Sequence, residues 1–324
     1  MAGTGWRTSR LLILCYHGVS LRDEHQWNSG LYISRDQFAR RLQVIQGSGY
    51  QVLPLAEGLR RLYANDLPPK ALVITFDDGL FDFYAQAWPL LEKYKFPATV
   101  YLTTYYSEYN RPIFRLVCDY MMWLKRGTLI EAGPASKTID LRTPESRANE
   151  LAILDNSAKN NALSAREKDR LAQDLARSIG VDWDEILDAR LLHIMNPREA
   201  AELARAGLDL QLHTHRHRTP REEAPFLREL DDNASRLQNI TGQRPAHFCY
   251  PSGVHYSGYP DWLKKWGVES AVTCEVGLAT AGDNAMMLPR LCDHAGLTEI
   301  EFDGWLSGLL HWFPRHNYHT VDPD

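Results

Sequence analysis

A short apolar segment that ends in two adjacent carboxylates constrains the fold of this chain more than any other feature. Residues 72–79 read LVITFDDG, so a β-branched run stops at Asp77, Asp78 and Gly79. An apolar run bounded by glycine predicts a buried strand with an abrupt end. Ligands of α/β sheets bind at the carboxyl ends of the strands, so we expect both aspartates to face a site. The alternative for these residues alone is an Asp-Asp-Gly turn without chemistry.

The segments on both sides of this strand alternate between strands and helices. Before residue 104, strands are predicted at 11–15, 51–53, 72–76 and 98–102, and helices after the N-cap Ser34, at 55–62 and at 80–94. The alternation resumes after residue 195, where Asn196 as N-cap and Pro197 at the first position begin a helix. This pattern predicts parallel strands joined by crossover helices.

Residues 106–195 interrupt the alternation. They carry helical periodicity, for example at 165–179, and few strand signals. We therefore expect a mostly helical insertion at 106–195 within a catalytic domain that spans 10–310, where it forms a lid or a wall of the substrate cleft. Residues 311–324 are expected to form a peripheral tail.

Composition narrows the function classes. The chain has 324 residues and a net charge of −5, which argues against general binding to nucleic acids or anionic membranes. Its five cysteines are an odd number without metal-site spacing, which favours a reducing compartment. The apolar run at 11–15 is too short for a signal peptide, and no apolar run of about 18 residues occurs. We therefore expect no transmembrane helix and a cytoplasmic location.

A pair of histidines follows the predicted strand at 208–212. His213 and His217 are four residues apart, a spacing that brings both imidazoles to one side of a helical turn or of a curled loop. Together with one carboxylate they form a set of three ligands that leaves positions for water and substrate, and nitrogen and oxygen ligands suit zinc or a related metal. The alternative is a basic surface loop. His215, between them, is expected to point away.

These motifs resemble those of a known family. The TFDDG at 75–79 and the His-Thr-x-x-His from His213 to His217 resemble motifs one and two of the polysaccharide deacetylases, which are carbohydrate esterase family four with the NodB homology domain. The FCYPSG at 248–253 and the YHGV at 16–19 resemble a third motif and an amino-terminal motif of one branch. The resemblance covers about 10–104 and 195–295 and implies a distorted (β/α) barrel of the NodB type.

The resemblance also implies a role for individual residues. Asp78, His213 and His217 match the ligands of one divalent transition metal, with zinc as the first expectation and cobalt and nickel as alternatives. Asp77 matches the general base. The oxyanion is expected to be held by the backbone around Tyr250 and Pro251, which follow one another in the third motif.

Two positions depart from the usual pattern. The third motif lacks its usual arginine, and we expect Arg290 to orient Asp77 in its place, with a surface arginine as the alternative. Asp293 is the candidate partner of that pair. The general acid is expected to be His17 from the first strand, ahead of the rival histidines His294 and His311.

The function implied is metal-dependent removal of acetyl groups from N-acetylhexosamine units of a polysaccharide or glycan precursor, with release of acetate. The expected partner is that glycan, with no role for nucleic acid. Two alternatives stay open at this point. One is a hydrolase of the same fold that acts on another amide or on an acetyl ester, and the other is a non-catalytic carbohydrate-binding paralogue.

Overall fold

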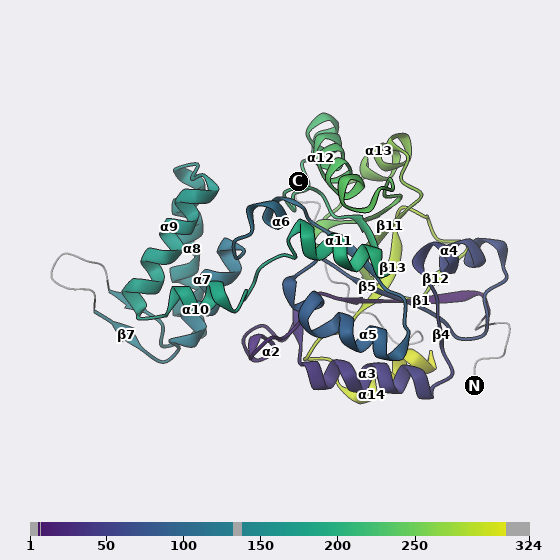
Figure 1. The fold of residues 1–324 in the computed structure, drawn as a ribbon, viewed down its shortest axis with the longest axis horizontal. Coiled ribbons are helices and arrows are strands. Elements are labelled where there is room, and N and C mark those ends of the chain that lie inside the picture. The colour runs from purple at the N-terminus through teal and green to yellow at the C-terminus, as the bar shows by residue number, and fades with distance from the viewer. Residues whose placement is uncertain (1–5, 7, 132–137, 309–324) are drawn as a thin grey trace. The chain divides into compact units, whose positions relative to one another are not determined.

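The structure is a computed structural model that describes residues 6, 8–131 and 138–308 (Figure 1). It divides into two compact units. Residues Tyr109–Ile194 form the second unit, and the described residues on both sides of this stretch form the first. Because the arrangement of the two units is not determined, each is described by itself.

The first unit is a closed barrel of parallel strands. Each strand pairs in parallel with its neighbour, and β1 closes the ring by pairing with β5, so that Cys15 lies opposite Thr75. Within the described residues, the ring contains seven strands in the order β1 (Arg10–Tyr16), β13 (Leu288–Cys292), β11 (Ser270–Val276), β10 (His247–Cys249), β9 (Asp209–Leu212), β6 (Thr99–Leu102) and β5 (Ala71–Phe76). The predicted (β/α) barrel is thereby confirmed.

Among the residues that the structure describes, four short strands and a set of helices accompany the barrel in this unit, and two of these strands, β2 (Gly18–Val19) and β3 (Tyr32–Ile33), pair with one another in parallel. Strand β4 (Gln51–Val52) extends the sheet next to β5, and β12 (Ala279–Thr280) runs antiparallel to β1. The helices lie around the strands in Figure 1. They are α2 (Glu24–Trp27), α3 (Arg35–Gly47), α4 (Leu55–Ala64), α5 (Trp88–Tyr94), α6 (Tyr105–Tyr109), α11 (Pro197–Arg205), α12 (Glu223–Thr241), α13 (Tyr259–Trp266) and α14 (Glu299–Ser307).

Local sequence signals determine where several of these helices begin. The Ser34 side chain accepts a hydrogen bond from the Gln37 N–H at the start of α3. Asn196 caps α11 in the same way, and Pro197 occupies the first turn, where its missing N–H costs nothing. These caps agree with the sequence predictions.

The helix predicted at 80–94 is present over 81–94, but its middle is π-helical. A π-helical turn, η1 (Phe83–Ala87), precedes α5. Pro89 lies in the first turn of α5, where it cannot donate the hydrogen bond that a continuous helix requires. A wider turn accommodates this missing donor, as π-bulges commonly do.

The strands are buried on both faces, as expected when helices cover a parallel barrel. Residues Leu11 to Tyr16 of β1 are at most 1% exposed. Helix α4 approaches the strands closely at Gly58, where a Cβ atom would lie 2.9 Å from Val73 Cγ2 and 3.3 Å from Leu11 Cδ2. Each fully buried aliphatic side chain contributes about 1.5–3 kcal/mol to stability, so this contact surface holds the barrel together.

The second unit is mainly helical. It contains a two-stranded hairpin and the helices α7 (Phe114–Leu124), α8 (Pro144–Asn160), α9 (Ala165–Ile179) and α10 (Trp183–Asp188). The hairpin consists of β7 (Leu129–Ile130) and β8 (Ile139–Asp140). Ser164 caps α9, and its apolar face, including Leu175 and Ile179, is buried. Across the described parts of both units, no helix has the length and apolar character that a membrane span requires.

Candidate active site

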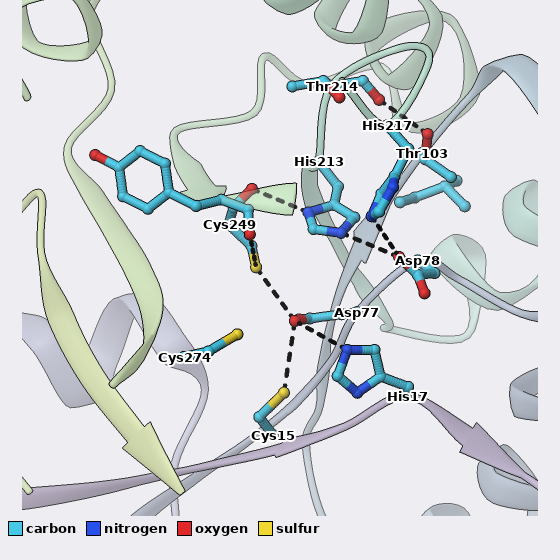
Figure 2. A network of polar contacts seen from close by, with 12 residues as sticks. Cys15, His17, Asp77, Asp78, Thr103, His213, Thr214, His217, Cys249 and Cys274 are labelled. Carbon is cyan, nitrogen blue, oxygen red and sulfur yellow. Dashed lines mark hydrogen bonds and ion pairs between the residues drawn. The ribbon is translucent and has the colours of Figure 1, made fainter. Parts of the chain in front are cut away.

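The turn at the end of β5 separates its two carboxylates. Asp78 and Gly79 both adopt positive φ angles, 66° and 78°. A Cβ atom at Gly79 would lie 2.3 Å from Leu102 Cδ1, so only glycine fits. As Figure 2 illustrates, Asp77 points toward Cys15, Cys249 and His17, whereas Asp78 points toward the two histidines of the second motif. The adjacent aspartates therefore have different surroundings.

Asp78 meets His213 and His217 through a single oxygen. Its Oδ1 lies 3.1 Å from Nε2 of His213 and 3.1 Å from Nε2 of His217. The histidines follow β9 on a curled loop in which Thr214 and His217 have φ angles of 59° and 53°. Such left-handed residues are uncommon outside glycine and occur often at functional sites. The spacing of four residues is thus realised by a loop, one of the two predicted ways.

The other contacts of His213 determine which of its two ring nitrogens carries the proton and which carries the lone pair. Its Nδ1 lies 2.9 Å from the Cys249 carbonyl oxygen, and its backbone N–H donates to Asn233 Oδ1 at 2.9 Å. A carbonyl can only accept, so Nδ1 carries a proton. In the neutral ring, Nε2 then directs its lone pair at Asp78 Oδ1. Two acceptors at this distance repel one another unless a cation lies between them.

This arrangement fits a divalent transition metal. Two imidazole nitrogens and a carboxylate oxygen, with ligand atoms all within 4.8 Å of one another, form a typical open three-ligand set. A backbone carbonyl that fixes the second ring nitrogen is a common support for a metal-binding histidine. Burial opposes ionisation of Asp78, but the charge of the neighbouring His217 helps to outweigh it, and the Asp78 pKa lies well below its usual value.

Asp77 is held by Arg290 instead. Arg290 donates from Nη1 to Oδ1 at 2.8 Å and from Nη2 to Oδ2 at 2.7 Å, and both side chains are buried. Its Nε donates to the Thr273 carbonyl. Burial favours the protonated acid, but the guanidinium outweighs it and lowers the pKa of Asp77, so this group is a carboxylate at neutral pH.

The structure describes two of the three candidate acids, His17 and His294. His17 follows β1, and its Nε2 lies 3.7 Å from Asp77 Oδ2. Burial lowers the His17 pKa, an effect that the charges of Asp77 and Asp78 oppose. His294 is half-buried, and its Nδ1 contacts the Ser29 carbonyl and the Gly296 N–H. His311 lies outside the described residues.

Asp293, the candidate named as a partner for Arg290 and Asp77, pairs with another arginine. Asp293 accepts a hydrogen bond from Arg41 Nε at 3.1 Å, and this second buried pair joins α3 to the residue after β13. Arg290 directs its guanidinium at Asp77 instead. Asp293 therefore pairs with Arg41 of α3 and does not contact the Arg290–Asp77 pair through this carboxylate oxygen.

Residues of the third motif pack beside the site. The Tyr250 N–H donates to the Val272 carbonyl at 3.3 Å, and its buried hydroxyl donates to the Met286 carbonyl at 2.9 Å. Pro251 has no N–H, and it begins the 3₁₀ turn η2 (Pro251–Gly253). In this turn Ser252 has a φ angle of 55°.

Sequence reasoning missed three polar neighbours. The thiols of Cys15 and Cys249 lie 3.5 Å and 3.3 Å from Asp77 Oδ2. Burial raises the pKa of Cys15 to about 12 and that of Cys249 well above its usual value, so both are neutral thiols. Asn233 of α12 holds the His213 backbone. Two sequence signals could have identified Cys249 and Asn233 as neighbours of the site. Cys249 lies inside the third motif, and Asn233 is a polar residue on the buried face of a helix.

Comparisons with known proteins show which proteins this chain is similar to. YxkH of Bacillus subtilis is 32% identical over 97 residues, which cover 30% of this chain and 33% of the relative. The poly-β-1,6-N-acetyl-D-glucosamine N-deacetylase of Escherichia coli K12 is 29% identical over 102 residues, which cover 30% of this chain and 14% of the relative. The matches therefore span a third or less of these relatives.

The solved structure of the Streptococcus pyogenes deacetylase PplD in complex with acetate is 20% identical, with a TM-score of 0.60. The superposition covers 94% of this chain and 99% of PplD, and it shows a shared fold. Residues 64–271, more than half of the sequence, match the Polysaccharide deacetylase family. The chain therefore belongs to the polysaccharide deacetylases, the hydrolase family of the NodB homology domain.

Proposed function

We propose that this protein is a metal-dependent N-deacetylase that hydrolyses the acetamide of N-acetylhexosamine units in a polysaccharide or glycan precursor. The observation that carries the proposal is that the two adjacent carboxylates have different partners. Asp78 faces two imidazoles, whereas Asp77 lies against Arg290. The family match and the E. coli relative named for poly-N-acetylglucosamine deacetylation support the choice of substrate.

Asp78, His213 and His217 would hold the metal, for which zinc is the first choice because its ligands here are two nitrogens and one oxygen. When bound, such an ion supplies Lewis acidity to an acetamide carbonyl and to the attacking water. The Cys249 carbonyl keeps the His213 ring in the tautomer that binds through Nε2. Asn233 fixes the backbone of the same residue.

Asp77 acts as the general base. Its carboxylate takes a proton from the water that attacks the acetamide carbon. Arg290 orients both carboxylate oxygens, and the buried surroundings keep the group in one position. Because the arginine lowers the pKa of Asp77, the base is in its ionised form at the start of the reaction.

His17 acts as the general acid. An amine leaves poorly as an anion, so the departing nitrogen needs a proton when the C–N bond breaks. The His17 imidazole lies beside Asp77, close enough for both to serve one substrate group. The products are acetate and the free amine of the hexosamine.

The backbone of the third motif holds the developing oxyanion. Two backbone positions of the expected Tyr250–Pro251 element offer no free donor, because the Tyr250 N–H bonds to the Val272 carbonyl and Pro251 has no N–H. The donor that we propose is therefore the next amide, that of Ser252 in η2. One well-placed donor of this kind contributes roughly 3–4 kcal/mol to transition-state stabilisation. We assign the catalytic domain to 10–310, with 106–195 as a mostly helical insertion within it.

The direct test is acetate release from β-1,6-linked N-acetylglucosamine oligomers. The zinc-loaded protein should release acetate and expose one free amine for each acetate. Treatment with a chelator should stop the release, and added zinc or cobalt should restore it. Release that continues after complete metal removal, or its absence from a protein shown to contain metal, would contradict the proposal.

A further inference from the structure

A polar pocket of about 520 Å³ lies within the second unit, apart from the residues of the candidate active site. All of its lining residues belong to Tyr109–Ile194, so it does not depend on how the two units are arranged. The lining consists of Tyr109, Asn110, Arg111, Arg166, Asp169 and Arg170. Three of these six residues carry a guanidinium, and one carries a carboxylate.

The single carboxylate of the pocket is already engaged. Asp169 Oδ2 accepts a hydrogen bond from the Tyr109 hydroxyl at 2.8 Å and lies 3.6 Å from Arg111 Nε. These contacts fix the segment before α7 against α9 and balance the charge of Arg111. Arg166 and Arg170 then leave the pocket with an excess of about two positive charges at neutral pH.

The other two arginines are placed where a helix disfavours them. Arg166 and Arg170 are one turn apart on α9, so their like charges lie side by side. Both lie in the first two turns, close to the positive end of the helix dipole. The one acidic residue of the first turn, Glu167, accepts hydrogen bonds from the Ser164 N–H and hydroxyl in the capping box. These bonds and, to a lesser extent, the charge of Arg170 lower the pKa of Glu167, so Glu167 offsets part of the repulsion. An anion in the pocket would relieve this repulsion.

We propose that this pocket binds a phosphoryl or diphosphate group carried by a small molecule. Guanidinium groups match phosphate oxygens in paired hydrogen bonds, and two excess charges suit a dianion better than a single carboxylate. The volume exceeds what a bare phosphate fills and lies in the usual range of small-molecule sites. The group has two sources, a sugar phosphate in solution or a phosphorylated lipid headgroup.

Calorimetric titration of the whole chain with inorganic pyrophosphate and with N-acetylglucosamine 1-phosphate tests the proposal. Replacing both arginines, as Arg166→Ala with Arg170→Ala, should weaken binding about tenfold or more, because charged hydrogen bonds are lost. Arg177→Ala is the matched control, since Arg177 lies on the same helix, is exposed, and pairs with Asp174 outside the pocket. The control should bind like wild type.

A second arm distinguishes the two sources. Co-sedimentation with phosphatidylcholine vesicles, with and without phosphatidic acid, whose headgroup is a phosphomonoester, should reveal binding that requires both arginines and is displaced by pyrophosphate if the source is a lipid. Pyrophosphate binding without vesicle binding assigns the site to a soluble sugar phosphate. No pyrophosphate binding by the wild type, or equal binding by the double variant, overturns the proposal. These outcomes do not depend on deacetylase activity.

Discussion

Both carboxylate oxygens of Asp77 accept hydrogen bonds from one side chain, that of Arg290, which lies 213 residues later in the chain. The pair joins the end of β5 to β13 inside a closed barrel, with both side chains buried. An isolated buried charge is costly, so each member requires the other. The same contact that stabilises the barrel therefore also orients the proposed base.

Replacing Arg290 tests that double role. Arg290→Ala should lower the free energy of unfolding by about 3–5 kcal/mol, because a buried carboxylate loses its partner. Arg290→Lys keeps the charge but not the paired geometry, and should reduce turnover about 10- to 100-fold in folded protein. Denaturant unfolding and acetate release measure the two effects.

Arg41→Lys is the matched control for this prediction. Arg41 and Asp293 form another buried pair in the same unit. Among the described residues, neither member of this pair makes a hydrogen bond to Asp77. This substitution should lower stability and leave the turnover of the folded enzyme near the wild-type value. If Arg290→Lys behaves in the same way, Arg290 is only a structural residue.

The lowered pKa of Asp77 predicts how stability depends on pH. In the unfolded chain, the pKa of an aspartate is about 3.9. The folded pKa lies below that value, so the stabilisation is complete above the unfolded pKa and is lost as pH falls through the folded pKa. The stability difference between wild type and Asp77→Asn should be largest above about pH 4 and should shrink in stronger acid. A difference that grows as pH falls would refute the assigned charge state.

The proposed metal ligands can be tested by metal content. His213→Ala should lose the bound metal, because one of three ligands is removed. His215→Gln is the control within the same loop, since His215 bonds to Thr104 and packs on Tyr105 rather than on Asp78. Elemental analysis should find metal in the control and not in His213→Ala. Normal metal content in His213→Ala would exclude His213 as a ligand.

The proposed acid predicts a different signature. His17→Ala should lower turnover by about 10²- to 10⁴-fold, the usual contribution of a general acid, while the metal stays bound. His294→Ala should have no effect, because the Nδ1 of that ring contacts Ser29 and Gly296 and not Asp77. Kinetics and metal content on the same preparations check both statements. An unaffected His17→Ala together with a severe His311→Ala would assign the acid to His311.

Much of the fold could be predicted because local signals agree with the overall architecture. Alternating strands and helices indicate parallel strands joined by crossover helices, and the resemblance of the motifs implies that these strands form a barrel. The caps at Ser34 and Asn196 fix where helices begin. The motifs also name residues that the barrel brings together, since strand ends meet at one edge. Asp78 and His213 are 135 residues apart and still in contact.

The remaining features depend on packing that the sequence pattern does not contain. The π-turn before Pro89 arises from a missing donor within an otherwise regular helix. Asp293 pairs with Arg41 because α3 packs where no motif indicates it. The thiols of Cys15 and Cys249 reach Asp77 only through the closure of the barrel.

The most direct test of the central claim is Asp77→Asn, with metal content and acetate release measured on one sample. Asp78, His213 and His217 are unchanged in this variant, so the metal should be present at the wild-type level. Without the base, acetate release from N-acetylglucosamine oligomers should fall by at least about 10²-fold. Full metal content with wild-type acetate release would contradict the assignment of Asp77 and with it the division of labour between the two aspartates.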